Sequence, residues 1–426
     1  MRLGSSGRAG GSRLRGLAGD SENNEVKPWK IAVVTSHPIQ YQAPWFRAMA
    51  GHADLEVEVF FCHRATASEQ ANAGFGVAFD WDIPLTEGYR HRLLRNVAPL
   101  PSLSAFSGLD TPEIHDVIAS GRFDAVIVNG WHYKSAWQAI RACWATKTPV
   151  MMRGDSHLRS PRHPVKRLLK RPVYLWFVPK FDACLAAGKW STDYFLYYGA
   201  KRERIFFVPH VIDEDRFQSE CLRLQSRRGE LRRTWKLSEN AVVFLFAGKF
   251  IDKKRPMDFV QAVDRAVRRG VCIEALMAGD GPLRQECERF AIENRTPVRF
   301  AGFLNQSQIA SAYVASDVLA LPSDGGETWG LVVNEAMVCG RACIVSDRVG
   351  CGPDLVISGE TGLVFPLGDV ECLAKLMTQC AEDKPGVARM GVCARHRMAR
   401  YSTSVAVEGV LRAVEAVAGN AGGTGA

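Results

Sequence analysis

Two glutamates in the second half of the chain have the type and spacing to hold a hydroxyl-rich ligand. Glu327 and Glu335 are separated by seven residues within the stretch Pro322 to Gly340. Lys249 and Lys254 follow an earlier apolar run. Carboxylates accept hydrogen bonds from sugar hydroxyls, and ammonium groups stabilise the charge of a departing diphosphate. The pattern therefore indicates a site for a nucleoside diphosphate sugar, although the glutamates also suit an ordinary helix start and the lysines a solvated turn.

The same stretch predicts where a diphosphate would lie. A strand should end at about Leu321, and a helix should begin near Trp329 or Gly330. The first amides of a helix have no partner within it, so those of Gly330, Leu331 and Val332 would face an anion. Glu327 would then lie in the loop before the helix.

Short apolar runs alternate with longer amphipathic stretches from Lys30 onward, which predicts α/β architecture with parallel sheets. The predicted strands of the first half are Ile31–Thr35, Val57–Phe61, Ala125–Val128, Val150–Arg153, Ala183–Ala187 and Ile205–Val208. Those of the second half are Val242–Gly248, Ile273–Ala278, Val298–Phe303, Val318–Pro322, Ala342–Ser346 and Leu363–Pro366. We therefore expect two doubly wound, Rossmann-like domains that face a cleft, where ligands bind beyond the carboxyl ends of the strands.

The domain boundaries follow from shifts in composition. We expect a disordered N-terminal tail over 1–26, a first domain over 27–220, a charged linker region over 221–236, a second domain over 237–398, a helix region over 399–418 and a flexible tail over 419–426. The last helix should cover Val405–Val417.

Several polar residues of the first half follow predicted strands and should reach the cleft. His37, Gln40 and Tyr41 come after the first strand, and His132 comes after the strand that ends at Val128. We expect these four residues on the acceptor side, although aromatic neighbours of His132 also suit simple packing. The run Asp213-Glu214-Asp215 resembles a metal-binding motif, but its place after a proline at a domain edge favours a helix N-terminal cap.

Composition narrows the function further. The 426 residues carry 54 Lys and Arg against 45 Asp and Glu, a formal charge of +9 that is spread over several segments. This excess favours phosphate ligands but does not identify a nucleic-acid binder.

The 12 cysteines are never spaced as Cys-x2-Cys, so we expect Cys339, Cys343 and Cys351 to be buried thiols rather than metal or redox groups. No window is apolar enough to span a bilayer and residues 1–26 have no apolar core, so we expect a cytoplasmic location.

One basic segment suggests a membrane contact. Residues 159–180 contain seven basic residues and no acidic one, interleaved with leucines and aromatic residues. The basic residues are Arg159, Arg162, Lys166, Arg167, Lys170, Arg171 and Lys180. Such a face can lie on an anionic membrane, although it also suits a solvated surface beside a packed segment. We therefore expect peripheral contact with the cytoplasmic membrane face and a lipid-linked acceptor.

The order and spacing of these pieces resemble the retaining glycosyltransferases of family 4, which have the two-domain B-type fold. The resemblance runs from VVTSHPIQYQAPWF through FFVPHVID, GKFIDKK, MAGDGP and the Glu-x7-Glu stretch to SDRVGCGPDL and GETGLVFPLGD. It implies that Glu327 contacts the donor sugar and Glu335 holds the ribose. Lys249 stands where the family usually has Arg, and Lys254 matches the usual Lys; both would face the diphosphate. His157 matches a histidine that many relatives place near the reacting sugar, so we expect a catalytic role for it with Glu327, although a loop histidine with a structural hydrogen bond suits the position equally.

The chain also departs from the family pattern. His37-Pro38-Ile39-Gln40 replaces a Gly-Gly loop, and Pro209-His210 replaces a frequent Pro-Asn-Gly. Arg255 replaces a glycine, and Thr328 stands where Gly or Pro is common. None of these changes removes a charged motif residue. The resemblance further implies that the last helix crosses back to the first domain.

Taken together, these patterns predict transfer of a sugar, with retention, from a UDP- or GDP-sugar to a hydroxyl of a glycan or lipid-linked saccharide. We expect no cofactor and no metal in the chemical step. A nucleotide-sugar epimerase of the same fold is the alternative, because it needs the same donor site and no acceptor. A non-catalytic nucleotide-sugar binding protein is disfavoured by the presence of both glutamates and both lysines, and we expect no nucleic-acid partner.

Overall fold

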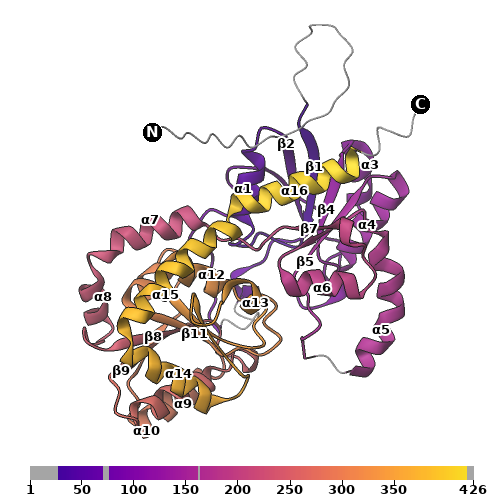
Figure 1. Cartoon of the computed structure of the whole chain (residues 1–426). Helices are drawn as coiled ribbons and strands as arrows, with labels where there is room; N and C mark the ends of the chain where they lie inside the picture. Colours follow the sequence, from indigo (N-terminus) through magenta and orange to yellow (C-terminus); the bar gives the residue numbers. More distant parts are fainter. Residues whose placement is uncertain (1–26, 71–75, 162–163, 420–426) are drawn as a thin grey trace, which may run out of the picture.

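The computed structural model describes residues 27–70, 76–161 and 164–419, which form two α/β domains (Figure 1). Over these residues the strand order is β3-β2-β1-β4-β5-β6-β7 in the first sheet and β10-β9-β8-β11-β12-β13 in the second. The first sheet contains β1 (Trp29–Thr35), β2 (Leu55–Phe61), β3 (Arg90–Leu93), β4 (Ala125–Asn129), β5 (Val150–Gly154), β6 (Ala183–Ala186) and β7 (Ile205–Phe207). The second contains β8 (Val242–Ala247), β9 (Ile273–Ala278), β10 (Val298–Gly302), β11 (Val318–Leu321), β12 (Ala342–Ser346) and β13 (Gly362–Phe365).

The apolar runs become parallel strands because helices cover both faces of each sheet. Alternate residues of β1 point to opposite faces, so Ile31 and Val33 enter one core while Ala32 and Val34 enter another. In both sheets the strand order reverses beside the first strand of the domain, at β1/β4 and at β8/β11. The loops after these strands therefore diverge and leave a crevice at the carboxyl edge. The expected pair of doubly wound domains is confirmed.

Helices surround each sheet. In the first domain they are α1 (Ala43–Ala50), α2 (Ala67–Gln70), α3 (Ile114–Gly121), α4 (Lys134–Thr146), α5 (Pro164–Phe177) and α6 (Lys189–Tyr197). Those that follow are α7 (Glu214–Gln225), α8 (Arg228–Thr234), α9 (Pro256–Val267), α10 (Arg284–Glu293), α11 (Ile309–Ala315), α12 (Leu331–Val338), α13 (Gly352–Leu355), α14 (Val370–Glu382), α15 (Lys384–Arg397) and α16 (Thr403–Ala418).

The charged stretch 221–236 is not the linker that its composition suggests. It belongs to α7 and α8, which pack on the second domain through buried residues such as Cys221 and Leu224. Arg232 is only 4% exposed, and its guanidinium donates to Asp317 and to four backbone carbonyls. Its charge is paired inside the fold, so a charged composition here does not mean exposure.

The last helix crosses between the domains as expected. Figure 1 shows α16 running from the second domain onto the first. Its apolar residues, including Val407 and Val410, pack into the core that contains α1 and β1. The expected N-terminal tail and residues 420–426 lie outside the described residues. Within the described part of the chain, no helix has the length and apolarity to cross a membrane.

Candidate active site

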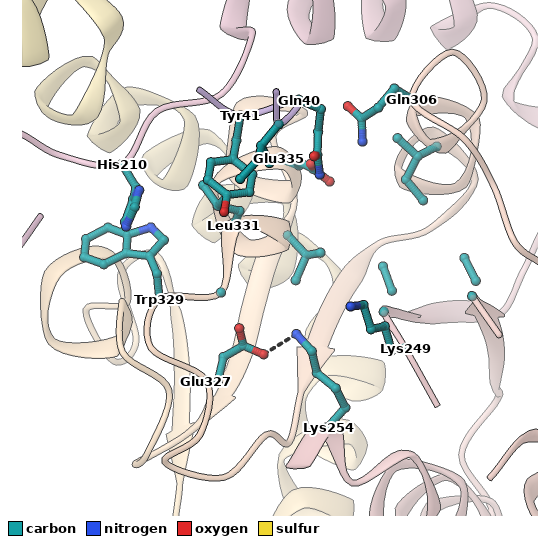
Figure 2. Close-up of a pocket in the computed structure, with 18 of the residues that line it drawn as sticks. Gln40, Tyr41, His210, Lys249, Lys254, Gln306, Glu327, Trp329, Leu331 and Glu335 are labelled. Carbon is teal, nitrogen blue, oxygen red and sulfur yellow. Dashed lines mark ion pairs between the residues drawn. The ribbon is translucent and has the colours of Figure 1, made fainter. Parts of the chain in front are cut away.

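A cavity of about 490 Å³ opens between the two domains, at the carboxyl edges of both sheets. Almost every residue that the sequence placed at the site lines it: His37, Gln40, Tyr41, Lys249, Lys254, Glu327, Gly330, Leu331, Val332 and Glu335. The cavity therefore brings the two glutamates, the two lysines and the start of α12 to one hollow (Figure 2).

Lys254 and Glu327 form an ion pair in this cavity, drawn as a dashed line in Figure 2. Both side chains are nearly buried, with exposed fractions of 12% and 11%. Burial alone would raise the pKa of Glu327, but the charge and hydrogen bond of Lys254 lower it below its ordinary value. Glu327 is therefore a carboxylate at neutral pH, ready to accept hydrogen bonds.

Lys249 lies on the loop after β8 and enters the same cavity. Burial, together with the neighbouring charges of Lys253 and Lys254, lowers the pKa of Lys249 to about 8. Three ammonium groups thus crowd one wall that faces the ligand space, an arrangement that an anionic ligand would relieve. The turn after β9 supports this loop closely. A Cβ on Gly279 would lie 1.9 Å from the carbonyl oxygen of Gly248, so only glycine permits the packing.

The helix that faces the cavity begins as predicted. Gly330 caps α12 with φ 101°, a left-handed conformation that favours glycine, and a Cβ there would lie 3.0 Å from Leu321. The amides that follow it lie at the N-terminus of a helix of eight residues, where the helix dipole favours negative charge. This end of α12 and the three lysines give the cavity its positive potential.

Glu335 lies inside α12 with its carboxylate held by a tyrosine. The hydroxyl of Tyr313 on α11 donates to Oε2 of Glu335 over 2.6 Å. Burial raises the pKa of Glu335 to about 7, against the opposing effects of Tyr313 and the charges of Arg216 and Lys254. Glu335 is therefore poised to change its protonation state near neutral pH. The sequence analysis predicted Glu335 but not Tyr313, because no sequence pattern indicates that this tyrosine of α11 faces α12.

The first domain contributes a polar wall. Burial lowers the pKa of His37 to about 4 and raises that of Tyr41 to about 12, so both side chains are neutral. His37 also bonds to the hydroxyl of Ser36 through Nδ1, at 3.0 Å. This wall offers neutral donors and acceptors, as a hydroxyl-bearing acceptor requires.

A network of polar and charged residues joins this wall to the loop before α12, and sequence reasoning missed it. Asp155 accepts a hydrogen bond from Thr328 of the second domain at 2.8 Å and lies 3.3 Å from Nε2 of His210. Burial favours the neutral form of Asp155, but His210, Thr328 and Arg153 together hold its pKa well below the usual range. Burial and the charge of Arg153 lower the pKa of His210, so the ring is neutral at pH 7. The network places an ionised carboxylate at the boundary between the domains.

The two remaining histidine predictions have different outcomes. His132 lines a smaller cavity of about 140 Å³ in the first domain, which shares Tyr41, Asp155 and His210 with the larger one. His157 lines neither cavity; it is 3% exposed, accepts a hydrogen bond from the amide of Arg159 and packs against Trp190. The structure therefore does not place His157 in either cavity, unlike the other residues expected at the site. Two residues earlier, Asp155 directly follows β5 and reaches the cavity.

Other motifs have the structural roles that the sequence favoured. Asp213 caps α7 by accepting a hydrogen bond from the amide of Arg216. Cys339, Cys343 and Cys351 are buried free thiols. Across the residues placed by the structure, His, Cys, Asp and Glu form no group of three that could hold a metal ion.

Comparisons with known proteins agree with this geometry. Residues 241–383 match the family model described as Glycosyl transferases group 1. The chain is 34% identical over 170 residues to N-acetyl-alpha-D-glucosaminyl L-malate synthase of Bacillus anthracis. This alignment covers 39% of this chain and 43% of that protein. It is also 30% identical over 176 residues to a phosphatidyl-myo-inositol mannosyltransferase of Mycolicibacterium smegmatis. That alignment covers 41% of this chain and 45% of the relative. These alignments thus span less than half the length of either relative.

Similarity to solved structures extends over the whole fold. The Anabaena Alr3699/HepE structure in complex with UDP and glucose matches with a TM-score of 0.66 at 16% identity, over 91% of this chain and 99% of that one. Such identity shows the fold alone. Residues 241–383 thus carry the sequence family Glycosyl transferases group 1, and the chain has the two-domain B-type glycosyltransferase fold.

Proposed function

We propose that the protein is a retaining glycosyltransferase that moves a sugar from a nucleoside diphosphate sugar, a UDP- or GDP-sugar, to a hydroxyl acceptor. One observation carries the proposal. The cationic wall of Lys249 and Lys254, the start of α12 and the carboxylates of Glu327 and Glu335 meet in one cavity between the domains. This set matches a diphosphate, a sugar and a ribose in that order.

The residues divide the chemistry as follows. Lys249, Lys254 and the first amides of α12 stabilise the negative charge on the departing diphosphate, which is electrostatic catalysis. Glu327 accepts hydrogen bonds from the sugar hydroxyls and fixes the sugar. In the unliganded protein Lys254 is paired with Glu327. A diphosphate competes for Lys254, so donor binding releases Glu327 for the sugar.

The transfer itself needs no protein nucleophile. The bond from the anomeric carbon to the phosphate oxygen breaks with its electron pair on the phosphate, and the acceptor oxygen bonds to the same face of the carbon. The acceptor proton passes to the departing phosphate. Asp155 lines the cavity together with Tyr41. Its carboxylate accepts a hydrogen bond from the acceptor hydroxyl and so orients it.

A donor screen tests the proposal. Among UDP-, GDP-, dTDP- and ADP-sugars, we expect a UDP- or GDP-sugar to raise the melting temperature, because a ligand that binds only the folded state stabilises it. The same nucleotide sugar should be slowly hydrolysed in the absence of an acceptor. Conversion of the donor sugar into its epimer under these conditions would instead establish the alternative activity, and absence of binding to all four donors would contradict both.

The exposed face of α5 supports a membrane-associated acceptor, which we propose as the second partner. Val165, Leu168, Leu169 and Trp176 fall on one face of the helix and are 54%, 68%, 71% and 58% exposed. Arg167, Lys170 and Arg171 lie on the same helix but on the sides turned away from this face, and residues 159–180 contain no acid. A helix that combines an exposed apolar stripe with positive charge fits an anionic bilayer surface.

Flotation with vesicles checks this face. Replacing Arg167, Lys170 and Arg171 with Gln is expected to weaken binding to vesicles that contain anionic phospholipid by about 100-fold, since each basic residue near the surface contributes about 1 kcal/mol. Replacing Arg265, Arg268 and Arg269 near the end of α9 removes the same charge from another exposed surface and should have little effect. Equal flotation of the wild type and the α5 variant would contradict the proposal.

A further inference from the structure

Residues 79–82, here termed the strap, leave the first domain and lie on the second. The side-chain amide of Asn305 donates to the carbonyl oxygen of Asp80 at 2.8 Å. Both the amide and the hydroxyl of Ser307 donate to the carboxylate of Asp82. The ring of Phe79 lies 4.3 Å, between centroids, from that of Phe303. Three kinds of contact therefore fix the strap on the loop that follows β10.

The chain just before the strap also touches the second domain. A Cβ on Gly76 would lie 3.2 Å from the amide nitrogen of Gly281 and 3.4 Å from Oδ1 of Asp280. Gly76 has φ 73°, so the backbone turns sharply at this point of contact. Asp280 and Gly281 lie in the turn after β9, beside the loop that carries Lys249. The segment thus bridges two loops at the carboxyl edge of the second sheet.

The strap places one side chain in the donor cavity. Trp81 lines it together with Phe303, Leu304, Gln306 and Ile309. Apart from Gln306, these side chains are aromatic or apolar, unlike the cationic wall around Lys249. Large flat rings in such a place suit a planar ligand group.

One polar group at this end has a fixed orientation. Arg216 donates to the backbone oxygen of Gln306 at 2.6 Å and to its Oε1 at 2.7 Å. Because Oε1 is engaged by the guanidinium, the side-chain Nε2 of Gln306 is left as a donor. A donor in a fixed place can bond to a carbonyl oxygen such as those of uracil, thymine and guanine.

We propose that the strap supplies a wall of the nucleobase subsite, with Trp81 against the face of the base and Gln306 donating to a base carbonyl. The inference rests on the proposed function, which puts the diphosphate at Lys249 and Lys254 and the ribose at Glu335. The base then occupies the cavity end beyond the ribose, and its contact with Trp81 stabilises the docked strap. The first domain thereby takes part in selecting the donor nucleotide, and base binding favours contact between the domains.

Binding of UDP and inorganic pyrophosphate to purified variants tests this inference. Replacing Trp81 with Ala is expected to weaken UDP binding by about tenfold or more, because stacking a base on an aromatic ring contributes about 1–3 kcal/mol. Pyrophosphate has no base, so its affinity should not change. Phe106→Ala removes an aromatic side chain that is 54% exposed and outside the cavity, and should bind both probes like the wild type.

A mutant cycle tests the docking contact itself. Asp82→Ala removes the bonds from both the amide and the hydroxyl of Ser307, so it should weaken UDP binding more than Ser307→Ala, which keeps the amide bond. The double variant should lose no more than Asp82→Ala alone, because the hydroxyl has no acceptor once Asp82 is gone. Equal UDP affinity of Trp81→Ala and the wild type, or equal losses for UDP and pyrophosphate, would overturn the inference. A wild type that binds pyrophosphate but neither UDP nor GDP would instead count against the proposed function.

Discussion

Replacing Lys254 with methionine is expected to lower kcat/KM for the donor by about 100- to 1,000-fold. The change removes an ammonium group from the cationic wall at the point where the departing diphosphate gains charge. It also leaves Glu327 buried without its ion-pair partner, which raises the pKa of Glu327 and reduces the carboxylate available to the sugar. Steady-state kinetics with the donor selected by the screen measure the effect.

A variant of Glu327 and a double variant test whether Lys254 and Glu327 act together. Glu327→Gln keeps the shape of the side chain but removes its charge, and we expect a loss of similar size. The double variant should lose little more than either single variant, because the two residues act as a unit. Lys375→Met removes an exposed lysine from α14 and controls for the change of charge. Turnover within fivefold of the wild type in Lys254→Met would refute the assigned role, provided that the variant remains folded.

Strands that are buried on both faces could be predicted from the sequence. Strands such as β8 and β11 are continuous apolar runs because both of their faces are covered, and their ends fix where Lys249 and Glu327 lie. By contrast, β3 reads Arg-His-Arg-Leu, and each of its residues is exposed at the sheet edge. Its residues pair through the backbone with β2, so no apolar pattern revealed it.

The parts of the site that sequence reasoning missed depend on contacts between domains. Asp155 is recognisable only when Thr328 and His210 are placed beside it. The prediction of His157 followed the family pattern at a loop whose backbone conformation could not be known. This conformation turns Asp155 into the cavity and leaves His157 packed against Trp190. Residues 221–236 were misjudged for a related reason, since the partner of Arg232 lies 85 residues away at Asp317.

Affinity for the nucleotide sugar selected by the donor screen is expected to be greatest between about pH 7 and pH 8. The pKa of Glu335 is raised to about 7, so below this pH the group carries a proton and loses an acceptor for the ribose hydroxyls. The pKa of Lys249 is lowered to about 8, so above this pH the cationic wall loses a charge. Affinity should therefore fall by up to about tenfold per pH unit on each side. The diphosphate diester of the ligand does not titrate in this range, and calorimetric titration across pH 5.5–9.5 gives the profile.

Two variants show which residue causes the fall in affinity on each side of the pH profile. Glu335→Gln should flatten the acid side and lower the maximum, whereas Lys249→Met should flatten the alkaline side.

The pH dependence of the free energy of unfolding tests the raised pKa of Glu335 independently of binding. A carboxyl whose pKa is raised on folding stabilises the protein below its unfolded pKa near 4.5, and that contribution is lost as the pH rises through 7. The unliganded Glu335→Gln variant should therefore resist urea better than the wild type at pH 8, by about 3 kcal/mol at most, although it binds the donor more weakly. A fall in affinity on the acid side that persists in Glu335→Gln would show that another group controls it.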